Sequence, residues 1–216
     1  MGRINSCNQI LDYCNNISFD WISDTKIEIM QNLRLKFAKK KILIYGLAKS
    51  GLSTLRFLKK TKSEIYCWDD NFLVRKSIKK NYLLNFKKKI ANNFFDFIVI
   101  SPGINVRKCY LKRFLVKNKT KIITDLDIFY NFNKNSQIIS VTGTNGKSTT
   151  CKLLEAVFKK AGYSTHLVGN IGEPILSLKK LNKKTIIIVE VSSYQLAYTR
   201  HFKSNHAAIL NISHDH

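Results

Sequence analysis

The chain has 216 residues, of which 44% are hydrophobic, so it is long enough for one large domain or for two small ones with an apolar core. No run of about 18 apolar residues and no hydrophobic signal segment is present, which predicts a soluble, cytoplasmic protein without membrane insertion. Lys and Arg outnumber Asp and Glu by 37 to 14, and the resulting net charge of +23 raises the hypothesis of nucleic-acid binding.

The positions of the basic residues argue against a nucleic-acid partner. Lys59-Lys60 and Lys159-Lys160 close two predicted helices, where cations oppose the helix dipole, and Lys183-Lys184 precedes a predicted strand. No basic motif interleaved with aromatic residues is present. A solvated surface therefore accounts for the charge. The five cysteines are odd in number and widely spaced, without a C-x-x-C pair, which predicts free thiols in a reducing compartment.

The first part of the chain alternates between strands and helices. Residues 1–40 carry no usable pattern, and we assign them no function. From Lys41 an apolar strand runs into a turn at 46–51 with G-x-x-x-x-G spacing and then into a helix, an order that is typical of dinucleotide-binding folds but weak as a fingerprint. A second strand, 64–68, ends at Asp69-Asp70, where such folds often contact a nucleoside; simple turn chemistry at a strand end is the alternative explanation.

A further apolar strand, Phe95 to Ile100, runs into Ser101-Pro102-Gly103, another loop at the carboxyl end of a strand, where parallel sheets bind ligands. The polar stretch from Asn131 to Ser136 is the best candidate for a linker. We therefore expect a domain boundary near residue 135, with one α/β domain over 41–135 and a second over 136–216.

A glycine-rich loop follows the apolar strand from Gln137 to Thr142 and precedes an amphipathic helix that stops at Gly162. Its unpaired backbone N–H groups at a helix N-terminus favour polyphosphate, with Lys147 on the phosphates and the Ser148 hydroxyl on magnesium. The loop departs from the strict G-x-x-x-x-G-K-[ST] pattern because Val141 occupies the first glycine position. A glycine turn without a ligand is the alternative that the strand, turn and helix order disfavours.

The strand and helix alternation continues to the end of the chain. A strand over 185–191 is apolar throughout except for Glu190, whose burial would require a cation or donors, so Glu190 is a candidate magnesium ligand opposite Ser148; a solvent-facing glutamate is the alternative. A last strand, His206 to Ile212, precedes Ser213-His214-Asp215-His216, which could bind metal. Spacing alone does not decide that point.

Four segments together resemble one enzyme family, the ATP-dependent Mur ligases. They are Thr142 to Thr149, Gly169-Asn170-Ile171-Gly172, Glu190 to Leu196, and Asn211 to His216. The resemblance extends from about Lys41 to the last residue. It is strongest to the members that add D-glutamate to UDP-N-acetylmuramoyl-L-alanine in peptidoglycan synthesis.

The resemblance implies the fold, the cofactors and the site residues. It implies a Rossmann-like parallel-sheet domain for the UDP part of the substrate, followed by a P-loop-type α/β domain for ATP and Mg²⁺, in a bacterial cytoplasmic monomer. The implied ATP-binding residues are Gly143, Thr144, Asn145, Gly146, Lys147, Ser148 and Thr149, and the implied metal ligands are Ser148, Glu190 and His216. The implied catalytic residues are Lys147, Glu190 and His216, and the implied substrate contacts are Lys49, Ser50, Asp69, Asp70, Gly103, Asn170 and Ser193.

Two positions depart from the family pattern, which often has arginine where Asn71 stands and glycine where Val168 stands. Family members also continue past the D-H motif into the rest of the ATP domain and a third domain. We therefore expect a truncated amino-terminal part of such a ligase that makes no amide alone. Two alternatives stay open: another Mur-type or folylpolyglutamate-type amide ligase, and a non-catalytic nucleotide- or nucleic-acid-binding module.

Overall fold

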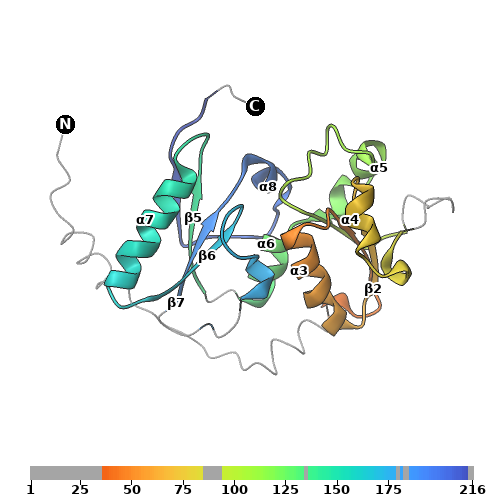
Figure 1. The fold of residues 1–216 in the computed structure, drawn as a ribbon, viewed down its shortest axis with the longest axis horizontal. Helices are drawn as coiled ribbons and strands as arrows, with labels where there is room; N and C mark the ends of the chain where they lie inside the picture. The colour runs from red at the N-terminus through yellow and green to blue at the C-terminus, as the bar shows by residue number, and fades with distance from the viewer. Residues whose placement is uncertain (1–35, 85–93, 134–135, 179–180, 182–184, 214–216) are drawn as a thin grey trace.

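The computed structural model of the protein describes residues 36–84, 94–133, 136–178, 181 and 185–213. These residues form two four-stranded sheets, and every strand pairing within them is parallel. Figure 1 shows the first sheet and its helices on the right and the second sheet on the left. Two parallel sheets with packed helices confirm the predicted α/β class.

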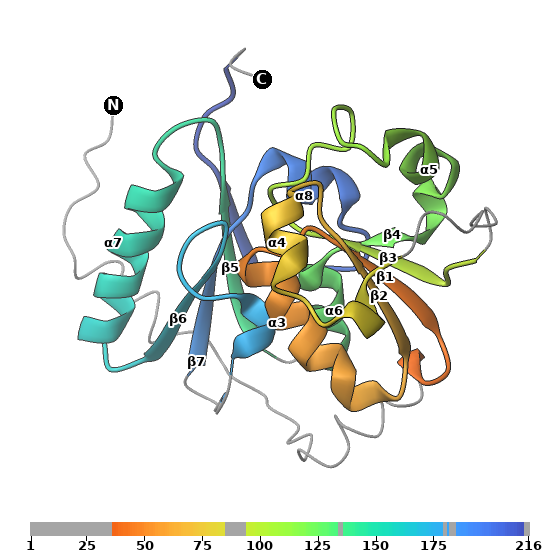
Figure 2. The same ribbon diagram turned by 45° about the vertical axis from the view of Figure 1, so that its right-hand side comes forward.

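The first sheet has the strand order β2-β1-β3-β4. In β1 every residue after Lys41 is fully buried, which is the pattern of a strand covered on both faces. The strands are β1 (Lys41–Tyr45), β2 (Glu64–Trp68), β3 (Phe97–Ile100) and β4 (Ile122–Ile123). The helical elements are α3 (Lys49–Leu58), η1 (Lys59–Thr61), α4 (Phe72–Lys76), η2 (Lys80–Tyr82), α5 (Lys112–Lys117), η3 (Lys119–Lys121) and α6 (Asp125–Phe132). Figure 2 shows the strands of this sheet lying side by side.

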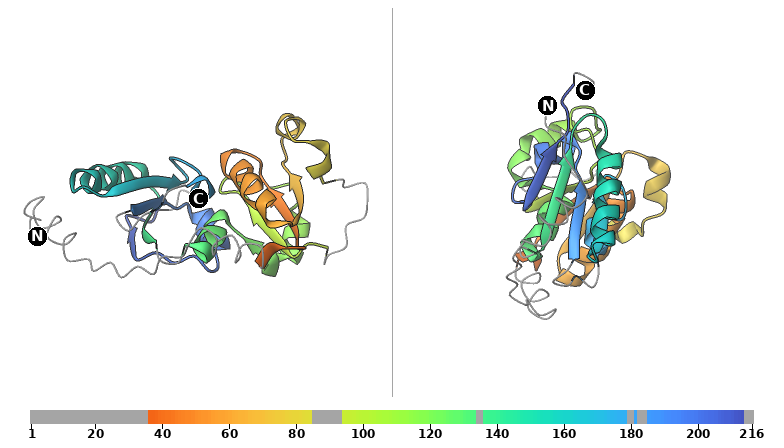
Figure 3. Two further views of the ribbon diagram at one scale, coloured as in Figure 1. Left: turned by 90° about the horizontal axis from the view of Figure 1, so that it is seen from below. Right: turned by 90° about the vertical axis from the view of Figure 1, so that its left-hand side faces the viewer.

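The second sheet has the strand order β6-β7-β5-β8. All six residues of β7 are buried, including the β-branched run that precedes Glu190. The strands are β5 (Gln137–Thr142), β6 (Ser164–Gly169), β7 (Thr185–Glu190) and β8 (His206–Ile209), and the helical elements are α7 (Lys147–Lys160), η4 (Ile175–Ser177) and α8 (Ser193–Tyr198). The right-hand view of Figure 3 shows α7 covering one face of this sheet. Gly162, with φ of +85°, follows α7 as predicted.

Several element boundaries differ from those that the sequence predicts. The strand expected from Phe95 begins at Phe97, and the last strand ends at Ile209 instead of Ile212. Helix α6 extends to Phe132, into the expected linker, because the Phe132 ring is buried against Phe37 and Phe57, with ring centroids 6.1 and 6.2 Å away. Phe37, which precedes the first expected domain, is thus part of the core, while residues 1–35 lie outside the described residues.

The two sheets share one apolar core. Leu126 and Phe129 of α6 pack in the same cluster as Ile42 of the first sheet, and so do Ile187 of the second sheet and Ile175 of η4. Figure 1 accordingly shows α6 in the middle of the molecule. The relative position of the sheets is therefore fixed by buried apolar contacts as well as by the chain that connects them.

A buried carboxylate also joins the two sheets. Thr124 and Asp127 form a capping box at the start of α6, and Asp127 is 1% exposed. Its Oδ1 accepts hydrogen bonds from the backbone N–H groups of Arg200, His201 and Phe202, at 2.9, 2.7 and 3.1 Å. Three donors from one loop satisfy a charge that would otherwise be costly to bury.

Candidate active site

The predicted phosphate loop is a tight turn between β5 and α7. Gly143 and Gly146 have φ of +144° and +82°, values that a residue with a Cβ rarely adopts, and Gly146 is the N-cap of α7. The Lys147 ammonium donates to the carbonyl oxygens of Gly143 and Thr144, both at 2.7 Å. The loop thus places a cation and the start of a 14-residue helix at one point, which favours an anion there.

Asn211, just after β8, holds this loop in shape. Its Oδ1 accepts from the Asn145 N–H at 2.8 Å, its Nδ2 donates to the Asn145 carbonyl at 3.0 Å, and its own carbonyl accepts from the Thr144 N–H at 3.0 Å. A Cβ on Gly143 would lie 3.1 Å from the backbone N and O of Asn211. Glycine is therefore required at position 143 by close backbone approach as well as by its φ.

Glu190 is buried at the carboxyl end of β7, beside the phosphate loop. Its side chain is 1% exposed; Oε2 accepts from the Ser148 hydroxyl at 2.7 Å, and Oε1 accepts from the Asn170 amide at 3.0 Å. None of the ion pairs among the described residues includes Glu190. The predicted juxtaposition of Glu190 with Ser148 is present, and the alternative of a solvent-facing glutamate is wrong.

The Ser148 and Glu190 oxygens suit a magnesium ion. Mg²⁺ prefers oxygen ligands and is usually bound in proteins by one or two side chains, with phosphate oxygens and waters completing its shell. A buried carboxylate without a cation partner among the described residues is the kind of group that such an ion stabilises. Within the described part of the chain no group of three or more His, Cys, Asp or Glu could hold a metal alone, and His216 lies outside it.

A cleft of about 530 Å³ lies where the two sheets meet. The first sheet contributes Lys49 and Ser50 from the start of α3 and Gly103 from the loop after β3, and the second contributes Asn170. Because Asn170 also donates to Glu190, this cleft adjoins the phosphate loop. Four of the predicted substrate residues are thus brought together, whereas Ser193, exposed at the start of α8, does not line this cleft.

Asp69 and Asp70 already accept hydrogen bonds from the chain itself. Asp69 accepts from the Leu47 N–H at 2.7 Å, and Asp70 accepts from the Tyr45 hydroxyl at 2.7 Å and from the Tyr110 N–H at 3.0 Å. These bonds shape the turns after β1 and β2, which is what the alternative of simple turn chemistry at a strand end predicts for Asp69 and Asp70. Neither aspartate lines the 530 Å³ cleft.

Sequence reasoning missed Arg75 at the same edge of the first sheet. Its guanidinium donates to the carbonyl oxygens of Asp69 and Asp70 and lies over the Trp68 ring, 4.4 Å from the ring centroid. It therefore brings a cation to the strand end where Asn71 replaces the arginine of the family pattern. Arg75 lies one helical turn after Asn71, in a segment whose hydrophobic residues show no clear helical or strand period, so the sequence did not indicate its position.

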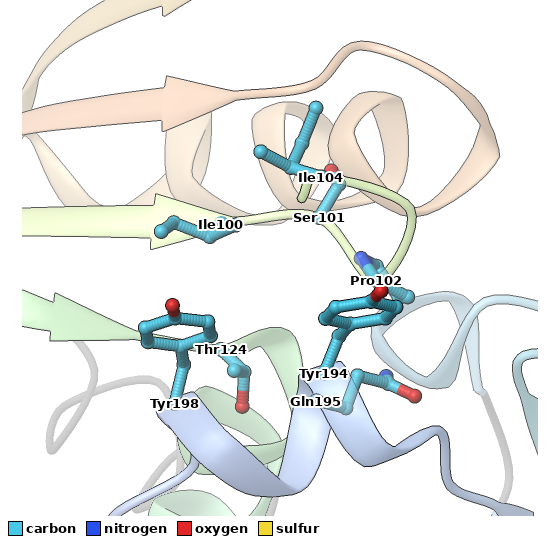
Figure 4. Close-up of a pocket in the computed structure, with 8 residues that line it drawn as sticks. All are labelled: Ile100, Ser101, Pro102, Ile104, Thr124, Tyr194, Gln195 and Tyr198. Atoms are coloured by element: carbon cyan, nitrogen blue, oxygen red, sulfur yellow. The ribbon is translucent and has the colours of Figure 1, made fainter. Parts of the chain in front are cut away.

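Sequence reasoning also missed Gln195 in α8. Figure 4 shows Tyr194 and Tyr198 of α8 pointing toward the end of β3 and the loop after it, across a small pocket that Gln195 also lines. Gln195 is 1% exposed and forms a capping box with Ser192, yet its Nε2 has no hydrogen-bond acceptor among the described residues. The S-x-x-Q spacing was the available signal, because it predicts a helix start at this position.

Cys151 is fully buried in the first turns of α7, so it is a core residue and not a reactive thiol. Burial, followed by the nearby Glu190 charge, raises the pKa of Cys151 to about 11. Burial likewise raises the pKa of Asp125 to about 6.

Among the described residues, no helix has the length and apolar character that a membrane span requires.

Comparison with known proteins identifies relatives of the chain. Residues 141–216 match the family model described as the Mur ligase middle domain. UDP-N-acetylmuramoylalanine–D-glutamate ligase of Caldicellulosiruptor saccharolyticus is 33% identical over 190 residues, covering 82% of this chain and 41% of that protein. The enzyme of the same name from Buchnera aphidicola subsp. Schizaphis graminum is 39% identical over 188 residues, covering 82% and 40%.

The chain spans about two fifths of the length of these curated relatives. A crystal structure of UDP-N-acetylmuramate:L-alanyl-gamma-D-glutamyl-meso-diaminopimelate ligase from Neisseria meningitides matches 83% of this chain and 62% of that chain, with 18% identity and a TM-score of 0.45. The phosphate loop and the buried Glu190 both lie within residues 141–216, the part of the chain that matches the Mur ligase middle domain. The chain therefore belongs to the Mur ligase family.

Proposed function

We propose that the chain forms the ATP-binding and UDP-substrate-binding parts of a cytoplasmic ligase that joins D-glutamate to UDP-N-acetylmuramoyl-L-alanine. One observation supports this proposal above the others: Asn170 lines the cleft between the sheets and also donates to Glu190, which accepts from Ser148 of the phosphate loop. A carboxylate substrate in the cleft would therefore lie beside the phosphates of a nucleotide in the loop. The names of the curated relatives agree with this activity.

The reaction is two successive group transfers. The substrate carboxylate attacks the γ-phosphorus of ATP, which forms an acyl phosphate and releases ADP. The D-glutamate amine then attacks the acyl carbon, phosphate leaves, and an amide bond and one proton are produced. Both the carboxylate and the triphosphate are anions, so catalysis depends on offsetting positive charge and on positioning.

The residues of this chain divide those tasks. Lys147 and the N–H groups at the start of α7 neutralise and orient the phosphates. Ser148 and Glu190 would hold Mg²⁺, which would supply Lewis-acid polarisation of the phosphoryl oxygens. Asn170 fixes the Glu190 carboxylate by its hydrogen bond, and Lys49 contributes a cation to the other wall of the cleft.

We assign residues 41–135 to the UDP part of the substrate and residues 136–216 to ATP. At the edge of the first sheet, Arg75 and Trp68 offer a cation and an aromatic ring near Asp69 and Asp70. These groups suit a nucleoside better than the two carboxylates alone, because both carboxylates are already hydrogen-bonded within the chain. His216 and Ser193 remain proposed members of the metal and substrate sites.

Nucleotide binding by the 216-residue chain tests the first half of the proposal. Calorimetric titration with a non-hydrolysable ATP analogue and Mg²⁺ should show saturable binding that falls at least about tenfold in Lys147→Ala, because a charge-assisted contact to phosphate is lost. Lys152→Ala is the matched control, since Lys152 is exposed on the same helix. Equal affinities for the two variants would contradict the assignment of the phosphate loop.

A chimaera tests the second half. The segment of the Buchnera aphidicola relative that aligns with this chain is replaced by the corresponding residues of this chain, and labelled amino acids are offered with ATP and UDP-N-acetylmuramoyl-L-alanine. We expect incorporation of D-glutamate, lost when the chimaera carries Glu190→Gln. Incorporation of a different amino acid, or turnover that survives the Glu190 substitution, would refute the proposal.

A further inference from the structure

A second cavity, of about 730 Å³, lies between the two sheets further along α3 from the candidate substrate cleft. Arg56 and Lys60 line one wall, and His166 and Glu173 line the other. Phe57 and Leu176 provide apolar surface between them. The volume lies within the range of sites that bind small molecules in proteins.

The two cavities share structural elements but not residues. The first turn of α3, with Lys49 and Ser50, lines the substrate cleft, whereas Arg56 and Lys60 lie two to three turns further on. A ligand of the second cavity therefore does not need the phosphate loop.

The charges in the second cavity favour an anion. Arg56 and Lys60 are four residues apart and both line the cavity, and within the described residues they form no ion pair and no side-chain hydrogen bond. The one acidic group of the lining, Glu173, is paired with His166, whose Nδ1 is 2.8 Å from the Glu173 Oε1. Two cations without a partner among the described residues thus face one carboxylate, which is already engaged with the His166 ring.

The apolar residues of the lining add a second requirement for a ligand of this cavity. Phe57 packs against the shared core, and Leu176 is 8% exposed, and both present apolar surface to the cavity. Glu173 is held by its backbone N–H, which donates to the Leu167 carbonyl at 3.1 Å. A ligand with an apolar body and an anionic head would satisfy both kinds of wall.

We propose that this cavity is a second ligand site, which binds a small amphipathic anion: a carboxylate or a phosphate monoester carried on an apolar ring. The anionic head lies against Arg56 and Lys60, and the ring lies against Phe57 and Leu176. Because one wall comes from α3 and η1 and the other from β6 and the segment between β6 and η4, an occupant bridges the two sheets. Occupancy therefore stabilises the folded chain by an amount that rises with the logarithm of the ligand concentration once that concentration exceeds Kd.

The test uses phenyl phosphate and benzoate as probes of the 216-residue chain in saturating ADP and Mg²⁺. Isothermal titration should show saturable binding of at least one probe, at least about tenfold weaker in Arg56→Gln/Lys60→Gln because charge-assisted contacts are lost. Lys108→Gln/Lys112→Gln is the matched control, since it removes the same charge outside this cavity. Phenol, which has the ring without the anion, should bind at least tenfold more weakly than phenyl phosphate.

A second measurement needs no substitution near the cavity. In leucine-methyl-labelled wild-type chain, phenyl phosphate should shift the Leu176 methyl resonances and leave those of Leu43, buried in the first sheet, unchanged. Equal weakening in the two double variants would overturn the proposal, since it would show general attraction to the +23 charge. Probe binding that is present without ADP and absent in saturating ADP, or unshifted Leu176 methyls, would overturn it as well.

Discussion

Substituting glutamine for Glu190 should stabilise the folded chain while weakening magnesium-dependent nucleotide binding. The carboxylate is 1% exposed and accepts bonds from Ser148 and Asn170, but no cation among the described residues pairs with it. A glutamine can keep both bonds, with its oxygen toward Asn170 and its amide donating to the Ser148 hydroxyl. The substitution therefore removes a buried charge without leaving a buried polar atom unpaired.

The magnitude follows from two opposing contributions. Burying an ion costs several kcal/mol, and hydrogen bonds to a charged group return about 1.5–3 kcal/mol each, so two such bonds offset most of the cost. We expect Glu190→Gln to raise the free energy of unfolding by about 1–2 kcal/mol, which for a chain of this size raises Tm by about 2–8 °C. Loss of the carboxylate should weaken Mg²⁺-dependent nucleotide affinity by about 10- to 100-fold.

Calorimetric melting without magnesium and titration of nucleotide with and without magnesium give the two readouts. Glu155→Gln is the matched control, because Glu155 is on the surface, paired with Lys159 at 2.8 Å, and its loss should change Tm by less than about 1 °C. A lower Tm for Glu190→Gln together with an unchanged magnesium effect on nucleotide binding would show that Glu190 is a purely structural acceptor.

Three further outcomes can be measured on the same chain. Gly169→Ala should lower the free energy of unfolding by about 2–4 kcal/mol in urea titration, because a Cβ there would lie 2.2 Å from the Glu190 carbonyl oxygen at φ of +104°; a loss under about 1 kcal/mol would contradict this. Burial raises the pKa of Asp125 from 3.8 to about 6, so the stability that this carboxyl contributes is full below pH 3.8 and is lost as the pH rises through 6. Between these pH values the free energy of unfolding of Asp125→Asn should therefore rise relative to that of wild type, by up to about 3 kcal/mol. Parallel pH profiles of the two proteins would refute this. The Cys67 and Cys151 thiols, with pKa raised by burial to about 12 and about 11, should stay unmodified by iodoacetamide at pH 8 until the chain unfolds, as peptide mapping would show.

Strong local patterns predicted the parts of the fold that they cover. Residues 186–189 are apolar and β-branched, Thr185 and Glu190 bound them, and together they form a fully buried strand. The phosphate loop was predictable because its glycines, Lys147 and Ser148 are consecutive in the chain. The placement of Glu190 opposite Ser148 followed from parallel topology, since the carboxyl ends of neighbouring strands meet at one edge.

Features that depend on distant contacts could not be predicted in the same way. The extension of α6 to Phe132 results from packing against Phe37, which is 95 residues earlier in the chain and carries no periodic signal. The position of Arg75 depends on how α4 turns back over the end of β2. The partner of Asn211 is likewise a loop 66 residues away, so its role in shaping the phosphate turn is not visible in either segment alone.

The recognition of one loop by Asp127 constrains how this part of the sequence can vary. The donors to the Asp127 carboxylate are the main-chain amides of residues 200–202, so the side chains at those positions are free of this constraint. Proline is the exception, because it has no amide hydrogen and would leave the buried charge one donor short. The bonds to Asp127 therefore exclude proline at 200–202 without selecting a side chain, whereas the Arg200 guanidinium, which donates to the Lys119 carbonyl, and the Phe202 ring, which packs on Tyr130, limit those two positions separately.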